Sequence, residues 1–230
     1  KKQIALASLF IVITAFIKVF GIVALILFIF YPNKGKAILY TIGWTLLLAA
    51  LPLLFVSTTQ LIFLYGSWME MLRGDHSVSI GLSVTGWLYT WFGIEAKQLT
   101  VIIGIVLLCL PLIKYNYFKE IKYKLLFLSS ILLWIVIFNH KAESPTFVIA
   151  VCGVAIWYFC QKPKIENTIL LFLVIIFTIL SATGIFPRAF HEKYVQHYVL
   201  KAVPCILVWF KITAELLLYK PEKEIQVQVA

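Results

Sequence analysis

Residues 125–138 read LLFLSSILLWIVIF, residues 139–146 read NHKAESPT and residues 147–159 read FVIAVCGVAIWYF. The first and third of these runs contain very few polar atoms. The octapeptide between them brings an imidazole, an ammonium, a carboxylate and a proline together. Apolar runs of this kind form helices in apolar surroundings, and charge is left to the connections. The stretch therefore predicts two helices joined by a short loop that carries chemistry.

The same alternation of apolar runs and charged gaps continues along the whole chain. Of its 230 residues, 62% are apolar and 13% charged, which is outside the range of soluble globular domains. With about 20 residues per crossing, the pattern predicts an all-α, polytopic transmembrane helical bundle of about 7 to 8 membrane segments. The apolar runs lie near residues 4–31, 37–57, 97–113, 125–138, 146–160, 168–186 and 199–219. Residues 1–219 are predicted to form the transmembrane domain, and 220–230 a polar cytoplasmic tail.

The first apolar run is too long for one crossing and contains Lys18. It is either one tilted helix or two short helices that meet at this lysine. The two-helix interpretation is preferred, because it separates the charged residues of the gaps more cleanly between the two sides of the membrane. A lysine in the middle of a membrane costs about 2.5–3.5 kcal/mol, so Lys18 should face a polar partner, a ligand or a cavity. Snorkelling to the membrane surface is the alternative.

The charged gaps sort into two chemically different sets when alternate gaps are assigned to alternate sides. One set holds ten lysines and no arginine or histidine: Lys34, Lys36, Lys114, Lys119, Lys122, Lys124, Lys162, Lys164, Lys220 and Lys223. The other holds all the histidines and both arginines. By the positive-inside rule the lysine set is cytoplasmic and the varied set faces outward. The net charge of +10 then reflects contact with an anionic lipid leaflet, and nucleic-acid binding is not predicted.

The largest outward gap, residues 58–96, begins with apolar and polar residues at helical spacing. This spacing predicts an interfacial amphipathic helix on the membrane surface. A cation, a carboxylate, an imidazole and a hydroxyl follow it closely: Arg73, Asp75, His76 and Ser77. They are predicted to contact substrate. The alternative is a turn in which Asp75 or Ser77 caps the next helix.

The loop at 139–146 contains more polar groups than a simple connection needs. A helix capped by Ser144 and opened by Pro145 would explain those two residues. It leaves His140, Lys141 and Glu143 unexplained, since each loses part of its hydration in a short loop beside the membrane. These three residues are therefore predicted to bind substrate.

Two further regions near the C-terminus carry charged side chains. In residues 184–198, Arg188 and His191 are candidate substrate contacts, with a solvated basic face as the alternative. No metal site is predicted, because His191 and His197 are six residues apart and point to different faces of a helix. Lys211 and Glu215, four residues apart, are expected to satisfy each other and to be structural.

Three stretches, AFIKVFG at 15–21, DHSVSIGLSVTGWL at 75–88 and NHKAESPTFVIAVCGVAIWYF at 139–159, resemble glycosyltransferase family 87. Members of this family are membrane mannosyltransferase-like enzymes of the GT-C superfamily, and the likeness is to members from Bacteroidetes-type bacteria. Other members carry Asn-Gln-Ser where this chain has Asp75-His76-Ser77. They also carry histidines after the Ser-Pro pair, where this chain has Thr146, so no role is transferred for those histidines.

The resemblance implies an enzyme of the bacterial inner (plasma) membrane with its active face on the periplasmic side. It would transfer a hexose such as mannose from a polyprenyl-phosphate sugar donor to a lipid or glycan acceptor, with inversion. No cofactor is predicted beyond this donor substrate. The catalytic base is expected in an N-terminal loop outside this chain, with Asp75 and Glu143 as fallback candidates. Lys18 and Arg188 are candidate contacts to the donor phosphate.

Two other functions stay open at this point. A transporter or flippase for a lipid-linked or anionic substrate predicts broken helices in corresponding halves and polar residues on both faces. A non-catalytic assembly subunit predicts that each charged residue of the outward loops can be replaced without loss of function.

Overall fold

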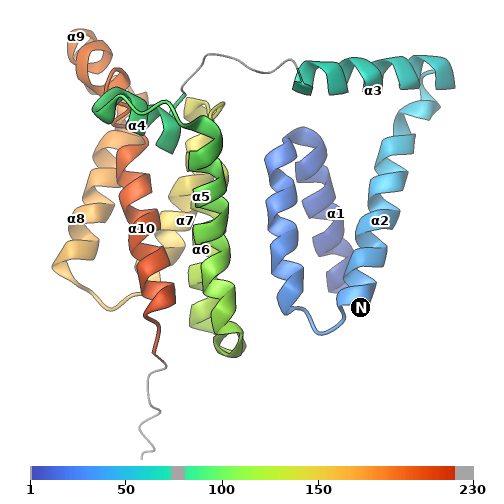
Figure 1. The fold of residues 1–230 in the computed structure, drawn as a ribbon, viewed down its shortest axis with the longest axis horizontal. Helices are drawn as coiled ribbons and strands as arrows, with labels where there is room; N and C mark the ends of the chain where they lie inside the picture. The colour runs from blue at the N-terminus through green and yellow to red at the C-terminus, as the bar shows by residue number, and fades with distance from the viewer. Residues whose placement is uncertain (1, 74–80, 221–230) are drawn as a thin grey trace, which may run out of the picture. The chain divides into compact units, whose positions relative to one another are not determined.

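The computed structural model describes residues 2–73 and 81–220 of the chain, and within these ranges the regular structure is entirely helical (Figure 1). The predicted all-α class is therefore confirmed. The chain divides into two compact units, Lys1–Ser79 and Ile80–Ala230. Each is taken by itself below. The predicted contacts Asp75, His76 and Ser77 lie outside the described residues.

Unit 1 contains α1 (Lys2–Ile17), η1 (Val19–Phe30), α2 (Lys34–Ala50), η2 (Leu51–Leu54) and α3 (Thr58–Arg73). The first apolar run is two helices, as preferred from the sequence, because the backbone is extended at Lys18 (φ −141°, ψ 117°). The helices on either side of Lys18 come close at Gly21. A Cβ atom there would lie 2.7 Å from the carbonyl carbon of Thr14. Only glycine allows this approach without a shift of the backbone.

Helix α3 is the helix predicted at the start of the long gap. None of its residues is buried, and large apolar side chains such as Phe63 and Met71 are exposed. Tyr65 Oη attaches the helix to α2 by donating a hydrogen bond of 2.8 Å to the carbonyl oxygen of Ala49. The helix itself is confirmed, and its place on a membrane surface stays a prediction.

Unit 2 contains the helices that form the larger core of the chain. In order they are α4 (Val84–Phe92), α5 (Lys97–Cys109), η3 (Leu110–Lys119), α6 (Ile121–Ile137), η4 (Ser144–Thr146), α7 (Phe147–Phe159), α8 (Ile165–Leu173), η5 (Val174–Ile179), η6 (Leu180–Ala182), α9 (Arg188–Phe190), η7 (His191–Gln196) and α10 (Val203–Leu217). Helices α6 and α7 pack along each other, and α10 packs against α6.

The contact between α6 and α7 depends on small residues. Ser129 Oγ donates a hydrogen bond of 2.6 Å to the carbonyl oxygen of Gly153. A Cβ atom at Gly153 would lie 3.0 Å from the carbonyl oxygen of Ser129. Small residues allow two apolar helices to approach in this way, and a hydroxyl gives a bond between them. The hairpin predicted from residues 125–159 is confirmed.

Three helices in the described part of the chain are long and apolar enough to cross a membrane: Lys34–Leu54, Lys97–Lys119 and Ile165–Ala182. Shorter apolar helices accompany them, among them Ser144–Phe159. The structure thus supports a membrane protein, with three candidate spans by length and composition. The third span includes a π-helical stretch, η5, between α8 and η6.

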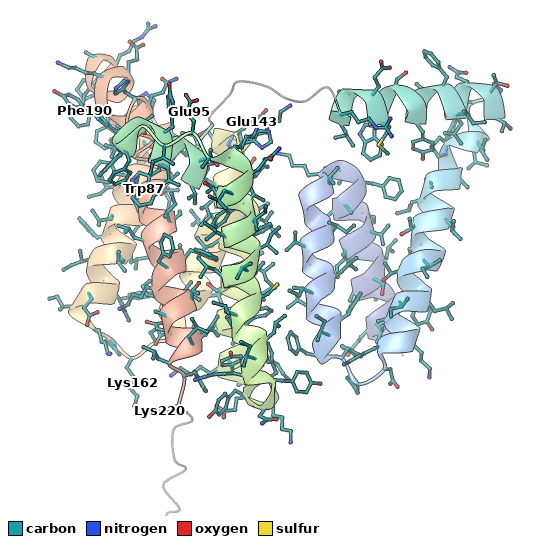
Figure 2. The ribbon with its side chains drawn as sticks, viewed as in Figure 1. Trp87, Glu95, Glu143, Lys162, Phe190 and Lys220 are labelled. Atoms are coloured by element: carbon teal, nitrogen blue, oxygen red, sulfur yellow. The ribbon has the colours of Figure 1, made fainter. Side chains whose placement is uncertain are left out.

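The two ends of unit 2 differ in composition. Lys162 and Lys220 lie at one end, and Glu143 and Phe190 lie at the opposite end (Figure 2). We call the first the lysine end and the second the loop end. Within this unit, the loops of the two predicted sets therefore lie at opposite ends.

Candidate functional site: a buried lysine in a polar cavity

A cavity of about 410 Å³ lies in unit 2. Residues from separate segments of this unit line it: Leu82, Ser144, Ser181, Ala182, His191, Val195, Gln196 and Lys201. The cavity brings the predicted contact His191 together with Ser144 from the predicted loop. Its buried cation, Lys201, was not predicted from the sequence.

Lys201 is buried, with 6% of its surface exposed. Its Nζ donates a hydrogen bond to Ser144 Oγ and lies 5.7 Å from the centroid of the Phe147 ring. No carboxylate of the described residues lies within ion-pair distance of this Nζ. The ammonium therefore faces a hydroxyl and an aromatic ring in place of a counter-ion.

A second hydroxyl lines the same cavity. Ser181 is 4% exposed, and its Oγ has no hydrogen-bond partner among the residues that the structure describes. A buried hydroxyl without a partner is costly, and such groups usually bind water or a ligand. Lys201 thus gives the cavity a cation, and Ser181 lies in the cavity wall with a hydroxyl that has no partner among the described residues.

The backbone beside Lys201 is irregular. Val199 has φ 54°, in the left-handed region where a β-branched residue costs about 1–3 kcal/mol. Backbone hydrogen bonds hold this turn, including Leu200 N to Val195 O at 2.9 Å. Thr178 Oγ1 adds a bond of 2.8 Å to the carbonyl oxygen of Lys201. The helix predicted from residue 199 therefore begins at Val203, because the chain turns first.

Two π-helical segments border this turn and the cavity. η5 carries Thr178 and precedes Ser181, and η7 carries His191 and Gln196. π-Helical turns are rare and occur frequently at functional sites. Together with the left-handed Val199, they show a backbone shaped around Lys201 rather than a regular helix end.

The predicted loop at 139–146 has a defined local structure. Asn139 Oδ1 accepts a hydrogen bond of 2.9 Å from the backbone N–H of Lys141, and Lys141 and Glu143 are exposed. Pro145 lies in the first turn of η4, as predicted. The predicted Ser144 cap is wrong, because no side chain caps η4 or α7. The Ser144 hydroxyl accepts from Lys201 instead.

Gly81 brings the chain before α4 against this loop. Its φ is +58°, and a Cβ atom there would lie 1.9 Å from the carbonyl oxygen of His140. No side chain fits in this space. Gly81 therefore allows the segment before α4 to pack directly against the backbone of His140.

The other predicted contacts lie in different places. His140 is partly buried in the loop, and Arg188 is highly exposed and forms an ion pair of 2.8 Å with Glu192. Lys18 and Arg73 belong to unit 1 and are exposed. Of the predicted residues, His191 lines the cavity, and His140, Lys141 and Glu143 belong to the loop that contributes Ser144.

Aromatic side chains accompany the cavity at the loop end. Trp91 Nε1 donates a hydrogen bond of 2.9 Å to the carbonyl oxygen of Tyr198, close in sequence to Lys201. The Trp91 and Tyr198 rings meet edge to face at 6.4 Å, and Trp87 lies 6.2 Å from Trp91. Rings with one polar atom are typical of the headgroup level of a membrane.

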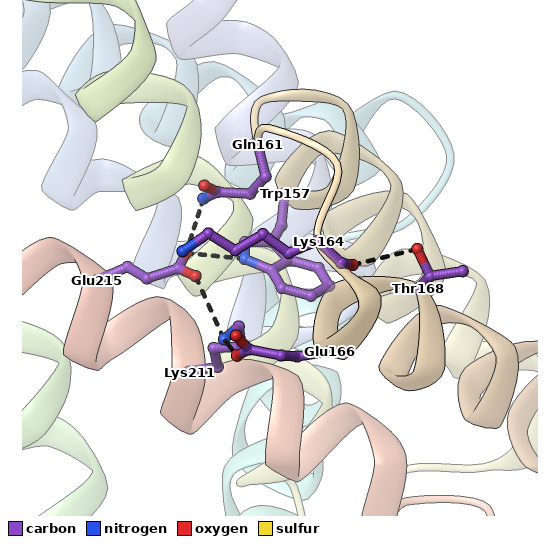
Figure 3. A network of polar contacts seen from close by, with 7 residues as sticks. All are labelled: Trp157, Gln161, Lys164, Glu166, Thr168, Lys211 and Glu215. Carbon is purple, nitrogen blue, oxygen red and sulfur yellow. Dashed lines mark hydrogen bonds and ion pairs between the residues drawn. The ribbon is translucent and has the colours of Figure 1, made fainter. Parts of the chain in front are cut away.

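The lysine end holds a network of polar side chains that differs from the cavity (Figure 3). Lys211 Nζ lies 2.8 Å from Glu166 Oε2 and 3.9 Å from Glu215 Oε1. Glu215 Oε2 accepts from Trp157 Nε1 at 2.9 Å and from Gln161 Nε2 at 2.7 Å. The predicted Lys211–Glu215 pair therefore exists, but Glu166 is the closer partner. This cation is compensated by the protein itself.

Two tyrosines at the lysine end also form hydrogen bonds. Tyr123 Oη donates a hydrogen bond of 2.9 Å to the carbonyl oxygen of Pro111, and the Tyr219 hydroxyl bonds to Glu120 at 2.5 Å. Burial, with a smaller effect from Tyr117, raises the pKa of Tyr123 from 10.0 to about 12. The tyrosine hydroxyls at this end thus have hydrogen-bond partners within the chain.

Compared with models of protein families, with curated proteins and with solved structures, the chain has no significant match. The function is therefore argued from the cavity, the loop and the sequence pattern.

Proposed function

We propose that the chain belongs to a multi-pass membrane glycosyltransferase of the GT-C type. The enzyme transfers a hexose such as mannose from a polyprenyl-phosphate sugar to a lipid or glycan acceptor, with inversion. Its short apolar helices join the three long ones to make about 7 to 8 crossings of the bacterial inner membrane. The loop end faces the periplasm and the lysine end the cytoplasm, in line with the positive-inside rule.

One observation carries this proposal: the cavity with Lys201 and the 139–146 loop both occur at the loop end of unit 2, and they share Ser144. A lipid-linked sugar phosphate needs an anion site, hydrogen-bonding groups for sugar hydroxyls and aromatic rings near the headgroups. The loop end supports all three needs with Lys201, the polar side chains of the loop, and Trp91 beside Tyr198.

Each polar group has a role in the proposed reaction. His140, Lys141 and Glu143 bind sugar or acceptor hydroxyls, and His191 extends the cavity toward the donor. A carboxylate takes the proton of the acceptor hydroxyl as that oxygen attacks the anomeric carbon, and the lipid phosphate leaves with the bonding electrons. Within this chain, Glu143 and Asp75 are the candidates for that carboxylate.

The lysine end favours an enzyme over a transporter. A transporter exposes binding groups to both sides of the membrane in turn. At the lysine end, Lys211 is occupied by Glu166 and Glu215, so this cation offers no open charge to a substrate.

The proposal is tested by transfer of radiolabelled mannose from polyprenyl-phosphate mannose to endogenous lipids and glycans, in membranes that contain the full-length gene product. Lys141→Ala and Glu143→Ala should reduce transfer by at least about tenfold, because each removes a charged contact. The matched control is Lys162→Ala, an exposed lysine at the lysine end, which should leave transfer unchanged.

One result would contradict the role given to the loop, and another would contradict the proposed enzyme. Undiminished transfer in both loop variants would make the loop structural. Absence of transfer by the correctly inserted parent protein would reject the enzyme.

A further inference from the structure

The contacts that Lys201 makes within the fold do not compensate its charge. A buried ammonium without a counter-ion pays a desolvation cost that one hydroxyl and one ring do not repay. The position of Lys201 is nevertheless fixed by the bond from Thr178 Oγ1 and by a left-handed valine close by. The chain thus holds a cation at a cavity at some cost in stability.

The groups around this cation suit an oxyanion. Ser144 Oγ accepts from Lys201 Nζ, so the Ser144 hydroxyl can still donate its proton to another acceptor. Ser181 Oγ is buried, lines the same cavity and has no partner among the described residues. One ammonium and two hydroxyls are donors for the oxygens of a phosphate, and charge-assisted bonds of this kind are strong.

The size of the cavity fits more than a single ion. Its volume of about 410 Å³ lies within the range of about 300–1,000 Å³ that is usual for small-ligand sites. Leu82 and Val195 contribute apolar lining beside the polar groups. The ligand therefore combines an anionic head with an apolar or neutral remainder.

We propose that this cavity is an oxyanion site in which Lys201 Nζ and the hydroxyls of Ser144 and Ser181 bind the non-bridging oxygens of a phosphate carried on an apolar chain. The claim that this phosphate belongs to the sugar donor rests on the proposed function. The claim that the cavity binds a phosphate does not. The site takes over the role expected of Lys18 and Arg188. Arg188 is exposed and already paired with Glu192.

The first experiment compares three probes by titration calorimetry on the full chain in maltoside micelles. Farnesyl phosphate carries the isoprenoid and the phosphate, farnesol only the isoprenoid, and inorganic phosphate only the anion. Farnesyl phosphate should bind more tightly than either of the others. Equal binding of farnesol would overturn the oxyanion site, and equal binding of inorganic phosphate would overturn its lipid-linked source.

The second experiment assigns the binding to the named residues. Lys201→Met keeps the length of the side chain and should weaken farnesyl phosphate binding at least about tenfold. Ser181→Ala should weaken it about threefold or more, because it removes one hydrogen bond. The matched control Lys211→Met removes a lysine from the opposite end and should change the affinity less than about twofold. Equal effects of Lys201→Met and Lys211→Met would overturn the assignment.

A third experiment separates anion binding from nucleophilic catalysis. A serine bonded to a buried lysine can also act as a nucleophile. Treatment with a fluorophosphonate should leave Ser144 unmodified. Covalent modification of Ser144 that disappears in Lys201→Met would overturn the oxyanion site in favour of a serine nucleophile.

The two proposals fail in different ways. Binding that depends on Lys201, in a protein without sugar transfer, would reject the glycosyltransferase and keep the oxyanion site. Sugar transfer with unchanged farnesyl phosphate affinity in Lys201→Met would reject the oxyanion site and keep the enzyme.

Discussion

Lys201 lies just before α10 and Lys211 lies within this helix, and their surroundings differ. Lys211 has Glu166 at 2.8 Å and Glu215 at 3.9 Å, whereas Lys201 has Ser144 and the Phe147 ring. Lys201 is also the more deeply buried of the two. The comparison teaches that burial alone does not assign a role to a lysine: the partners of Lys211 make it structural, and the lack of a counter-ion is what makes Lys201 the lysine that we propose binds a ligand.

This difference has an energetic consequence. At the lysine end, the removal of one partner leaves the others unpaired and weakens the fold. At the loop end, the removal of the cation relieves a cost that folding carries. Variants at the two ends should therefore change stability in opposite directions.

The largest loss of stability is expected when an acceptor of the polar network at the lysine end is removed. Glu215→Ala leaves Trp157 Nε1 and Gln161 Nε2 without their acceptor and removes one carboxylate from Lys211. We expect a loss of about 2–3 kcal/mol in the free energy of unfolding. The measurement is unfolding of the purified protein in micelles.

The matched control for this variant is Glu143→Ala. Its side chain is exposed at the loop end, so its removal should change stability by no more than about 0.5 kcal/mol. Equal losses in both variants would show that the lysine end is no more tightly paired than the surface.

The second effect concerns backbone contact at the loop end. Gly81→Ala should lower the free energy of unfolding by about 2 kcal/mol, since the new Cβ atom would overlap the carbonyl oxygen of His140. It should also weaken farnesyl phosphate binding by displacing Leu82 and the loop. Thermal unfolding and calorimetry measure the two effects.

Gly93→Ala is the control for Gly81→Ala. Gly93 also has a positive φ, 68°, but a Cβ atom there would have no neighbour within 4 Å. It should therefore show only the cost of the left-handed conformation, about 1 kcal/mol. A Gly81→Ala variant no less stable than Gly93→Ala would mean that the contact with His140 is not tight.

The third effect tests the opposite signs directly. Lys201→Met should raise the free energy of unfolding by about 1 kcal/mol, because a buried charge without a counter-ion is replaced by an apolar side chain. Lys211→Met should lower it by about 1 kcal/mol, because Glu166 and Glu215 lose their cation. Loss of stability in both variants would show that Lys201 is a structural cation like Lys211.

The smallest effect appears only in alkaline solution. Tyr123 has a folded pKa of about 12 against 10.0, so its neutral form stabilises the fold below pH 10 and this contribution is lost as the pH rises towards 12. Tyr123→Phe removes the hydroxyl that titrates. The stability difference between parent and variant should therefore shrink between these pH values in alkaline unfolding experiments. A constant difference would contradict burial of this hydroxyl.

The sequence predicted the elements that depend on local pattern. The hairpin around residues 139–146, the helix that starts the long gap and the break at Lys18 were all predicted. Each rests on apolar spacing or on one charge within an apolar run, which neighbouring residues are enough to decide. The alternation of loops between the two sides also predicted that Ser144 and His191 lie at the same end of unit 2.

The sequence could not predict the centre of the site. Lys201 was hidden in the last apolar run, although a lone lysine between leucine and alanine is the signal that could have identified it. Its partner Ser144 is 57 residues away, and the left-handed Val199 occurs in a residue type that rarely adopts this conformation. Both depend on packing between distant segments, which local pattern does not contain.

The bond between Lys201 and Ser144 also has an evolutionary consequence. Ser144 begins the short turn before α7, and Lys201 lies just before α10, so a substitution at either position changes the environment of the other. Among homologues the two positions should vary together: chains with an apolar residue in place of the lysine should tolerate the loss of the serine hydroxyl. Lys211 and Glu166 should covary in the same way, as lysine with an acid, independently of the first pair.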